Sequence, residues 1–524
     1  MVSGQVSDSV LPASEKFFLG GLRYDRGYYS GEVTGDNAVV FSVNGDGLLS
    51  IDVTGAVKQL PHGPEGKPAT ALVTNSGAII ADGGTVLLTT RAADGLVQTL
   101  VDAGGRIQAN SLGGRAGTIA LAGIGGSLRV DGAVLAEGLA SGARIGVSRR
   151  AGGGTAKLSA ANTTVEAGVK ITANATRSGH GGPVTVLSTS STNHAGGIAA
   201  RGGPNGGDGG TVEVSGEGRY VLTGTIDVGA PAGKAGNILV DPKDLTIVHG
   251  DAAAGNQNLA LAAGTGTLGY AAADTTNDQV SDATINTFTG NVTLHATENL
   301  VVANGVTISL VAAPAQNLVL QAGNNLTVNS IADAPTNVTA SGNIVLAASS
   351  STIPGNSPAA TNAGVLSVAG TLTSTHGGIF LSSDGSATTA GVTIGGTLNA
   401  ATTGSAGVIS VGGNTLALAS TASLTAGVRV DFAAVGGALT VGACGQSRDR
   451  PGGNRQRALH PLGPGGAYRR RHHDRRRRCG VGHHLRQQLR GDEPGPRSDR
   501  HGVADGGNGC DREHADRPCR NADP

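Results

Sequence analysis

The feature that most constrains the fold is a strand-sized motif that returns at a fixed interval. "NVTL" begins at Asn291, "NLVL" at Asn317 and "NIVL" at Asn343, so the pattern recurs twice after about 26 residues, a spacing within the range of known repeat architectures. A period of this size, made only of short strands and turns, is typical of a solenoid in which each repeat forms one coil. We expect each coil to hold about three short strands.

A second strand motif repeats within the same units. "NLVV" begins at Asn299 and "NLTV" at Asn325, which is the same spacing. The repeated Asn is interpreted as a turn residue that tolerates left-handed backbone geometry and forms a ladder with its counterparts in neighbouring coils. Alternate side chains of a strand point to the same face, so one apolar set should point inward and stack. That set is Val292, Leu294, Leu318 and Leu320.

The composition favours stacked coils over a globular core. The chain has 524 residues with 88 Gly, no Trp and only 12 Phe plus Tyr, whereas a large globular core normally uses many bulky aromatics. Small and β-branched residues suit short stacked strands. A hairpin-built sandwich is the open alternative, although it would require tight two-residue turns and more aromatics. We predict an all-β fold, a single-stranded parallel β-helix over residues 37–442.

The first 36 residues have a different character. The stretch Leu11–Asp36 reads "LPASEKFFLGGLRYDRGYYSGEVTGD". It resembles part of the barrel of outer-membrane transporters of two-partner secretion, in which a similar stretch precedes an Arg-Gly-Tyr loop, here Arg26 to Tyr28. These few residues cannot close a barrel. Residues 1–36 are therefore interpreted as a transporter-like fragment and not a domain, with an unrelated Gly/Tyr-rich hairpin as the alternative.

The body resembles the exported partners of such transporters, the filamentous haemagglutinin-like exoproteins. The resemblance covers about 400 residues, of which three stretches are the most telling. They are "DNAVVFSVNGDGLLSIDVTG" from Asp36, "VTNSGAIIADGGTVLLTTRAADGL" from Val73, and "RGGPNGGDGGTVEVSG" from Arg201. The resemblance implies a right-handed β-helix, an outer-membrane transporter as secretion partner, and adhesion to a host-cell or matrix surface. It also implies an extracellular or cell-surface location.

The N-terminus departs from that family. It shows neither the basic n-region nor the apolar h-region of a signal peptide, so we expect the export signal to be absent from this chain. No apolar stretch approaches the ~18 residues of a membrane helix.

Residues 443–524 are predicted to be a disordered, out-of-frame tail. They hold 18 of the Arg residues, no Lys and 7 of the 13 His. A nucleic-acid arm and a His/Cys metal site are the alternatives, but no C-x-x-C pair supports zinc. In GC-rich DNA, glycine codons read one base out of phase encode arginine, so a frameshift near Gly442 accounts for the run Arg475–Arg478. Such a segment should not fold. All four cysteines lie here: Cys444, Cys479, Cys510 and Cys519.

Two motifs in the body suggest chemistry. "GGDGGTVEV" from Gly206 is similar to a calcium-binding nonapeptide, but Thr211 stands where the motif needs Asp and Asp208 comes too early, so a glycine turn is preferred. Asp241, Lys243 and Asp244 suggest acid–base work. Pro242, between them, instead favours a turn or edge with its charges in water.

The histidines of the body stand singly, and no nucleophile–base pair is predicted among them. They are His180, His194, His249, His295 and His376.

We therefore predict a non-enzymatic adhesin fragment that binds through repetitive Thr/Ser/Asn faces. No catalytic, cofactor-binding or metal residue is expected, nor a specific nucleic acid or small-molecule substrate. Three alternatives stay open: a remnant of a two-partner-secretion transporter, a β-helical carbohydrate-active enzyme, and a non-functional product of a rearranged gene. The enzyme would require three or more carboxylates within hydrogen-bond reach of one another on one face.

Overall fold

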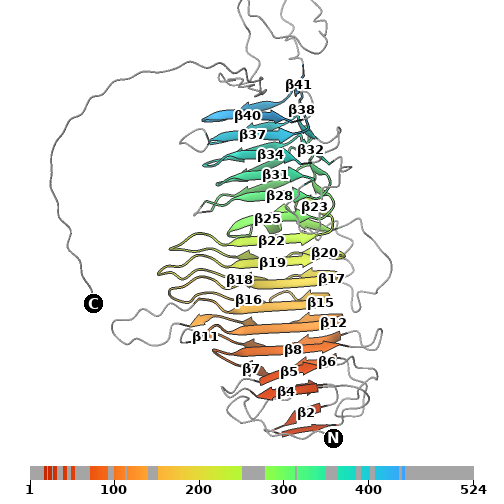
Figure 1. Cartoon of the computed structure of the whole chain (residues 1–524), viewed down its shortest axis with the longest axis vertical. Coiled ribbons are helices and arrows are strands. Elements are labelled where there is room, and N and C mark those ends of the chain that lie inside the picture. Colours follow the sequence, from red (N-terminus) through yellow and green to blue (C-terminus); the bar gives the residue numbers. More distant parts are fainter. Residues whose placement is uncertain are drawn as a thin grey trace, which may run out of the picture. The chain divides into compact units, whose positions relative to one another are not determined.

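The computed structural model of the chain shows an all-β parallel β-helix, in which short strands stack coil upon coil (Figure 1). The predicted fold class is therefore confirmed. The structure describes residues 71–91, 99–112, 115–139, 152–250, 278–312, 315–349, 364–384, 391–401, 407–435 and 439–442, and also five strands between residues 17 and 53. The tail predicted over residues 443–524 lies outside the described residues.

Three stacks of parallel strands make up the coils, and we call them faces 1, 2 and 3. Face 1 is a continuous ladder of hydrogen-bonded strands. Its strands are β8 (Thr85–Arg91), β12 (Thr118–Val130), β15 (Thr155–Val165), β17 (Val184–His194), β19 (Thr211–Gly216), β22 (Asn237–Pro242), β25 (Asn291–Ala296), β28 (Leu318–Ala322), β31 (Ile344–Ala348), β34 (Ile379–Ser383), β37 (Val408–Gly413) and β40 (Arg429–Ala434).

Face 2 begins with β6 (Ala71–Asn75) and β9 (Thr99–Ala103) and continues through the second halves of β12, β15 and β17. Its later strands are β20 (Arg219–Leu222), β24 (Gln279–Ser281), β23 (Leu245–Val248), β26 (Leu300–Val302), β29 (Leu326–Val328), β32 (Val365–Val368), β35 (Gly391–Ile394), β38 (Thr415–Leu418) and β41 (Leu439–Val441).

Face 3 consists of two separate sheets and a short pair. The first sheet holds β7 (Ala78–Ile80), β10 (Arg106–Gln108), β13 (Val134–Leu135), β16 (Lys170–Thr172), β18 (Gly197–Ala199) and β21 (Ile226–Asp227). The second holds β27 (Thr307–Leu310), β30 (Asn337–Ala340), β33 (Thr371–Ser374), β36 (Thr397–Asn399) and β39 (Ser423–Thr425). The pair is β11 (Ser111–Leu112) and β14 (Gly138–Leu139).

The core is a set of apolar columns that run through the coils. Val292 pairs with Leu318, and Leu294 with Leu320, and all four side chains are fully buried. Both predictions made from the repeat period, three strands per coil and this inward set, are confirmed. Because each coil covers the apolar row of the one before, stability accumulates along the stack.

The repeated asparagines form the predicted ladder. Asn317 and Asn343 each bond to the Asn one coil earlier, through the backbone N–H and, for Asn317, also the side chain. The expected left-handed geometry is wrong: among the described residues the only non-glycine with positive φ is Ser349, at 49°. The Asn therefore serves through its amide, which satisfies turn groups of the next coil, and not through a special backbone conformation.

One coil is built out of sequence order. β24 inserts between β20 and β23 on face 2, although it follows β23 along the chain. The chain then forms a single helical turn, α2 (Asp282–Ile285), capped by the Ser281 side chain, before β25 stacks on β22. This inserted excursion explains why Asn237 and Asn291, which are neighbours in the ladder, are 54 residues apart.

The N-terminal end is made of antiparallel strands. β1 (Phe17–Leu19), β2 (Leu22–Asp25) and β3 (Tyr28–Gly31) pair in order, and β1 also pairs antiparallel with β6. β4 (Val39–Val43) and β5 (Leu49–Val53) form a hairpin whose second strand pairs with β8. The stretch that resembles a transporter thus joins the first coils as backbone ladders.

Candidate binding face

The second sheet of face 3 presents an unusually uniform surface. Its strands read "TISL", "NVTA", "TLTS", "TLN" and "SLT", and the parallel register aligns their alternate residues into columns. Two outward columns result, one starting at Thr307 and one at Ser309. They are Thr307, Asn337, Thr371, Thr397 and Ser423, and Ser309, Thr339, Thr373, Asn399 and Thr425.

The row between the two columns anchors this sheet. It consists of five apolar side chains, each exposed by 3% or less, that stack on one another inside the solenoid. They are Ile308, Val338, Leu372, Leu398 and Leu424. Because the inward row is fixed by packing, the outward hydroxyls and amides are held at regular intervals. Strand spacing places neighbours about 4.8 Å apart along a column and about 7 Å apart across the columns.

The chemistry of this face is neutral and bifunctional. All ten outward positions are Thr, Ser or Asn, which both donate and accept hydrogen bonds, and none carries a charge. All are at least partly exposed. Among the described residues, only the Asn337 side chain has a hydrogen-bond partner, the Pro335 carbonyl oxygen at 3.5 Å. We call these ten residues the hydroxyl–amide face.

The other outward surfaces are less uniform. On face 1 the column through Glu213 continues with Leu239, Thr293, Val319 and Val345, so charged, apolar and polar residues alternate. The first sheet of face 3 likewise mixes apolar and charged side chains from Ile80 to Asp227. The hydroxyl–amide face is therefore a local property of the later coils.

The densest ionic cluster surrounds Arg129 on face 2. Its guanidinium lies 2.7 Å from Asp131 Oδ2, 3.2 Å from Glu166 Oε1 and 3.5 Å from Asp102 Oδ1. Burial and the neighbouring Asp131 raise the pKa of Asp102, and Arg129 partly offsets that rise. The three carboxylates converge on the arginine instead of on one another. The cluster thus straps three coils together and does not match the carboxylate groove expected of the enzyme alternative.

A carboxyl–imidazole pair lies on the outward side of face 1. Val240 pairs with Leu294, so Asp241 and His295 follow at the same level on adjacent coils. His295 Nε2 contacts the side-chain oxygen of Gln321 on the coil beyond. Asp241 Oδ1 and His295 Nδ1 are both buried without a hydrogen-bond partner among the described residues. The fold therefore brings together two groups that the sequence separates by a long insertion.

The surroundings of Asp241 favour its neutral form. Burial raises the pKa of the Asp241 carboxyl, His295 opposes the rise, and Glu213 adds to it. Ser215, directly beneath Asp241, donates its hydroxyl to Glu213 at 3.1 Å. The serine is thus engaged by a carboxylate and not by the imidazole, and no Ser–His pair forms in the order that nucleophilic catalysis requires.

The other motif residues separate. Lys243 reaches Glu298 on the next coil at 3.0 Å, while Asp244 Oδ1 accepts the backbone and side-chain N–H of Asn299, both at 3.1 Å. The three residues grouped in the sequence as Asp241, Lys243 and Asp244 therefore serve three different contacts.

The remaining histidines are also placed individually. His180 Nδ1 accepts the backbone N–H of Asp208 at 2.9 Å, and His249 Nδ1 lies 2.8 Å from Asp282 Oδ2. His194 is fully buried in the core. His376 Nδ1 lies 2.9 Å from the hydroxyl of its neighbour Thr375.

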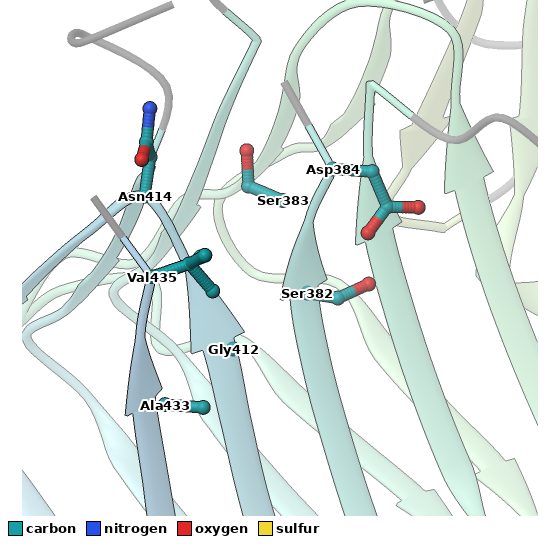
Figure 2. Close-up of a pocket in the computed structure, with 8 residues that line it drawn as sticks. Ser382, Ser383, Asp384, Gly412, Asn414, Ala433 and Val435 are labelled. Atoms are coloured by element: carbon teal, nitrogen blue, oxygen red, sulfur yellow. The ribbon is translucent and has the colours of Figure 1, made fainter. Parts of the chain in front are cut away.

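A groove lies at the ends of β34, β37 and β40, with Val435 on one side and Asp384 on the other (Figure 2). Its volume is about 470 Å³, and Asp384 is its single ionisable lining residue. A lone carboxylate offers no acid–base pair. The groove is lined by Ser382, Ser383, Asp384, Gly412, Gly413, Asn414, Ala433 and Val435.

No known family matches. Neither a protein-family model nor any curated protein shows significant similarity to the chain. Within the part of the chain that the structure describes, no helix is long and apolar enough to cross a membrane. In that same part, no three His, Cys, Asp or Glu side chains are arranged to hold a metal ion.

Proposed function

We propose that the chain is a non-enzymatic adhesin of the filamentous haemagglutinin type, and that the hydroxyl–amide face is its contact surface. The observation that carries the proposal is the unbroken run of ten Thr, Ser and Asn side chains in two columns over five coils. A neutral array of this kind suits a partner that presents repeated hydroxyl or amide groups, such as a host-cell or matrix surface.

Repetition supplies the affinity. A single hydroxyl contact with a partner in water contributes little, about 1 kcal/mol net. Ten such groups at fixed spacing act together, because each contact made raises the effective concentration for the next. The rigid inward row reduces the ordering cost of binding. In the proposed setting, an outer-membrane transporter of two-partner secretion delivers the protein to the cell surface.

The test is adherence of the purified full chain to cultured epithelial monolayers and to plates coated with their extracellular matrix. Replacing Thr371, Thr373 and Thr397 by Lys should lower adherence at least tenfold, because three cations disrupt a neutral array. The matched control replaces Thr327, Ser367 and Thr393, the outward column of face 2, by Lys. Equal loss in both variants, or no adherence by the unmodified chain, would contradict the proposal.

A carbohydrate-active enzyme is the second candidate, favoured by one observation. Asp241 combines an outward position, a raised pKa and an adjacent imidazole, which are properties of a general acid. Release of reducing or unsaturated ends from polygalacturonate or a neutral glucan would test this activity. It should disappear in Asp241→Asn and persist in Asp431→Asn. Absence of product from all substrates at high protein concentration would leave adhesion as the function.

A further inference from the structure

The last described coil ends the stack with its apolar interior partly uncovered. On β38, Leu416 is 2% exposed, whereas its partner one coil later, Leu439 on β41, is 42% exposed. Val441 on the same strand is 61% exposed. On face 1, Ile409 and Val411 are buried, but their successors on β40, Val430 and Phe432, are only partly buried.

The backbone of this coil is open as well. β40 pairs with β37, and β41 with β38; among the described strands neither has a neighbour on its other side. At the opposite end of the stack, antiparallel strands β1 to β5 add to the first coils (Figure 1). The two ends therefore differ, and only the end at β40 and β41 offers both an apolar row and free strand edges.

An edge of this kind pairs readily with another strand, and natural proteins normally cover or charge it. Here the edge strand carries one charge of each sign, because Arg429 and Asp431 lie two residues apart on its outward side, 2.6 Å between Nε and Oδ2. In an antiparallel pair of two copies centred on Val430, each Arg429 would face Asp431 of the other copy. The charges are therefore self-complementary under two-fold symmetry.

We propose that two copies of the chain associate end to end through β40 and β41, with β40 antiparallel to its counterpart. The partly covered Val430 and Phe432 of each copy then pack on those of the other, and the ladder of face 1 continues across the two-fold axis. A head-to-tail fibre does not form, because the strands that end the stack at its N-terminal side differ. The contact involves only the end of one coil per copy, so we expect micromolar affinity.

The experiment is sedimentation velocity of the full chain over a concentration series from about 1 to 200 μM, a range that brackets micromolar affinity. The unmodified chain should shift from monomer to dimer. Asp431→Arg and Arg429→Asp should each stay monomeric, because like charges then face each other. An equimolar mixture of the two variants should dimerise again, since each Arg pair meets an Asp pair.

Val311→Glu is the matched control, because Val311 is 55% exposed on an earlier coil and should leave dimerisation unchanged. Equal circular dichroism and thermal midpoints will show that the charge variants fold. A chain that remains monomeric at the highest concentration would overturn the proposal and indicate that residues 443–524 or another molecule covers this end. Variants that dimerise as well as the unmodified chain would overturn it too.

Discussion

The side-chain amide of Asn317 donates to Oδ1 of Asn291 one coil earlier at 3.0 Å, and the same oxygen accepts the backbone N–H of Asn317 at 3.1 Å. The relationship repeats, because Oδ1 of Asn317 accepts the backbone N–H of Asn343 at 2.7 Å. One oxygen thus satisfies two donors of the following coil. The ladder ties successive turns together where they carry no ladder of their own.

Replacing Asn317 by Ala should lower the free energy of unfolding by about 1–3 kcal/mol, because it removes two hydrogen bonds and leaves the N–H of Asn343 without its acceptor. Urea denaturation followed by circular dichroism measures the change. Thr373→Ala is the control, since that outward hydroxyl has no protein partner among the described residues and its loss should cost well under about 1 kcal/mol. Equal losses would show that the ladder contributes nothing.

Glycine is required where coils approach most closely. A Cβ on Gly210 would overlap the carbonyl oxygen of Gly182 in the preceding coil, which is backbone and cannot give way. Gly210→Ala should therefore cost at least about 3 kcal/mol or prevent folding, as overpacking and strain do at their worst. A Cβ on Gly412 meets nothing within 4 Å, so Gly412→Ala should be neutral or slightly stabilising. Thermal midpoints of the two variants give the comparison.

The sequence predicts the coils of the body better than the surfaces they create. The repeat period identifies the inward row through Val292 and Leu318, because a buried residue must recur at the same place in each coil. The hydroxyl–amide face escaped detection as a unit, since the steps along its first column are unequal and are longer before Thr371 than after it. Turns of variable length hide such columns from any fixed period.

Insertions hide contacts in the same way. Asp241 and His295 become neighbours only because β24 and α2 fold out between their coils. No local pattern signals that return. The position of β24 between β20 and β23 depends on which strand edge is free once the other coils have stacked, and this is a property of the whole stack.

His194 makes the solenoid sensitive to mild acid. Its side chain points inward between Val165 and Leu222, and neither ring nitrogen has a hydrogen-bond partner among the described residues. Burial lowers the pKa of His194 to about 4 from its ordinary 6.5, and the nearby Gly196 backbone opposes this only in part. Since the unfolded chain binds the proton first, stability is undiminished above pH 6.5 and falls as the pH drops from 6.5 to 4. The loss should reach roughly 3 kcal/mol.

Denaturation midpoints measured between pH 7 and 4 test this prediction. His194→Leu should remove most of the loss in that interval, because leucine fills the apolar column and does not titrate. His376→Leu, at an exposed position, should leave the pH dependence unchanged. A His194→Leu variant that loses stability as steeply as the unmodified chain would show that other groups dominate.

Asp282 joins three segments at the inserted turn, and its side chain is only 5% exposed. Oδ2 accepts the backbone N–H of Thr307 at 2.7 Å and lies 2.8 Å from His249 Nδ1, while Oδ1 accepts the N–H of Gly250 at 2.9 Å. Burial alone would raise the pKa of Asp282, but these hydrogen bonds outweigh it and lower the pKa below its ordinary 3.8. The carboxylate therefore stabilises the fold above its unfolded pKa, and this contribution is lost as the pH falls through the folded value.

Asp282→Asn should cost about 1.5–3 kcal/mol at pH 7, because a neutral amide replaces charge-assisted acceptors and turns one N–H toward backbone donors. The difference from the unmodified chain should shrink below pH 4, where the carboxyl itself becomes neutral. This window lies below that of His194, so the two effects separate in one pH series. Asp333→Asn provides the comparison on an exposed turn, where surface substitutions typically change stability by less than about 0.5 kcal/mol. A cost for Asp282→Asn that stays constant from pH 7 to 3 would mean that shape, and not charge, holds the three segments together.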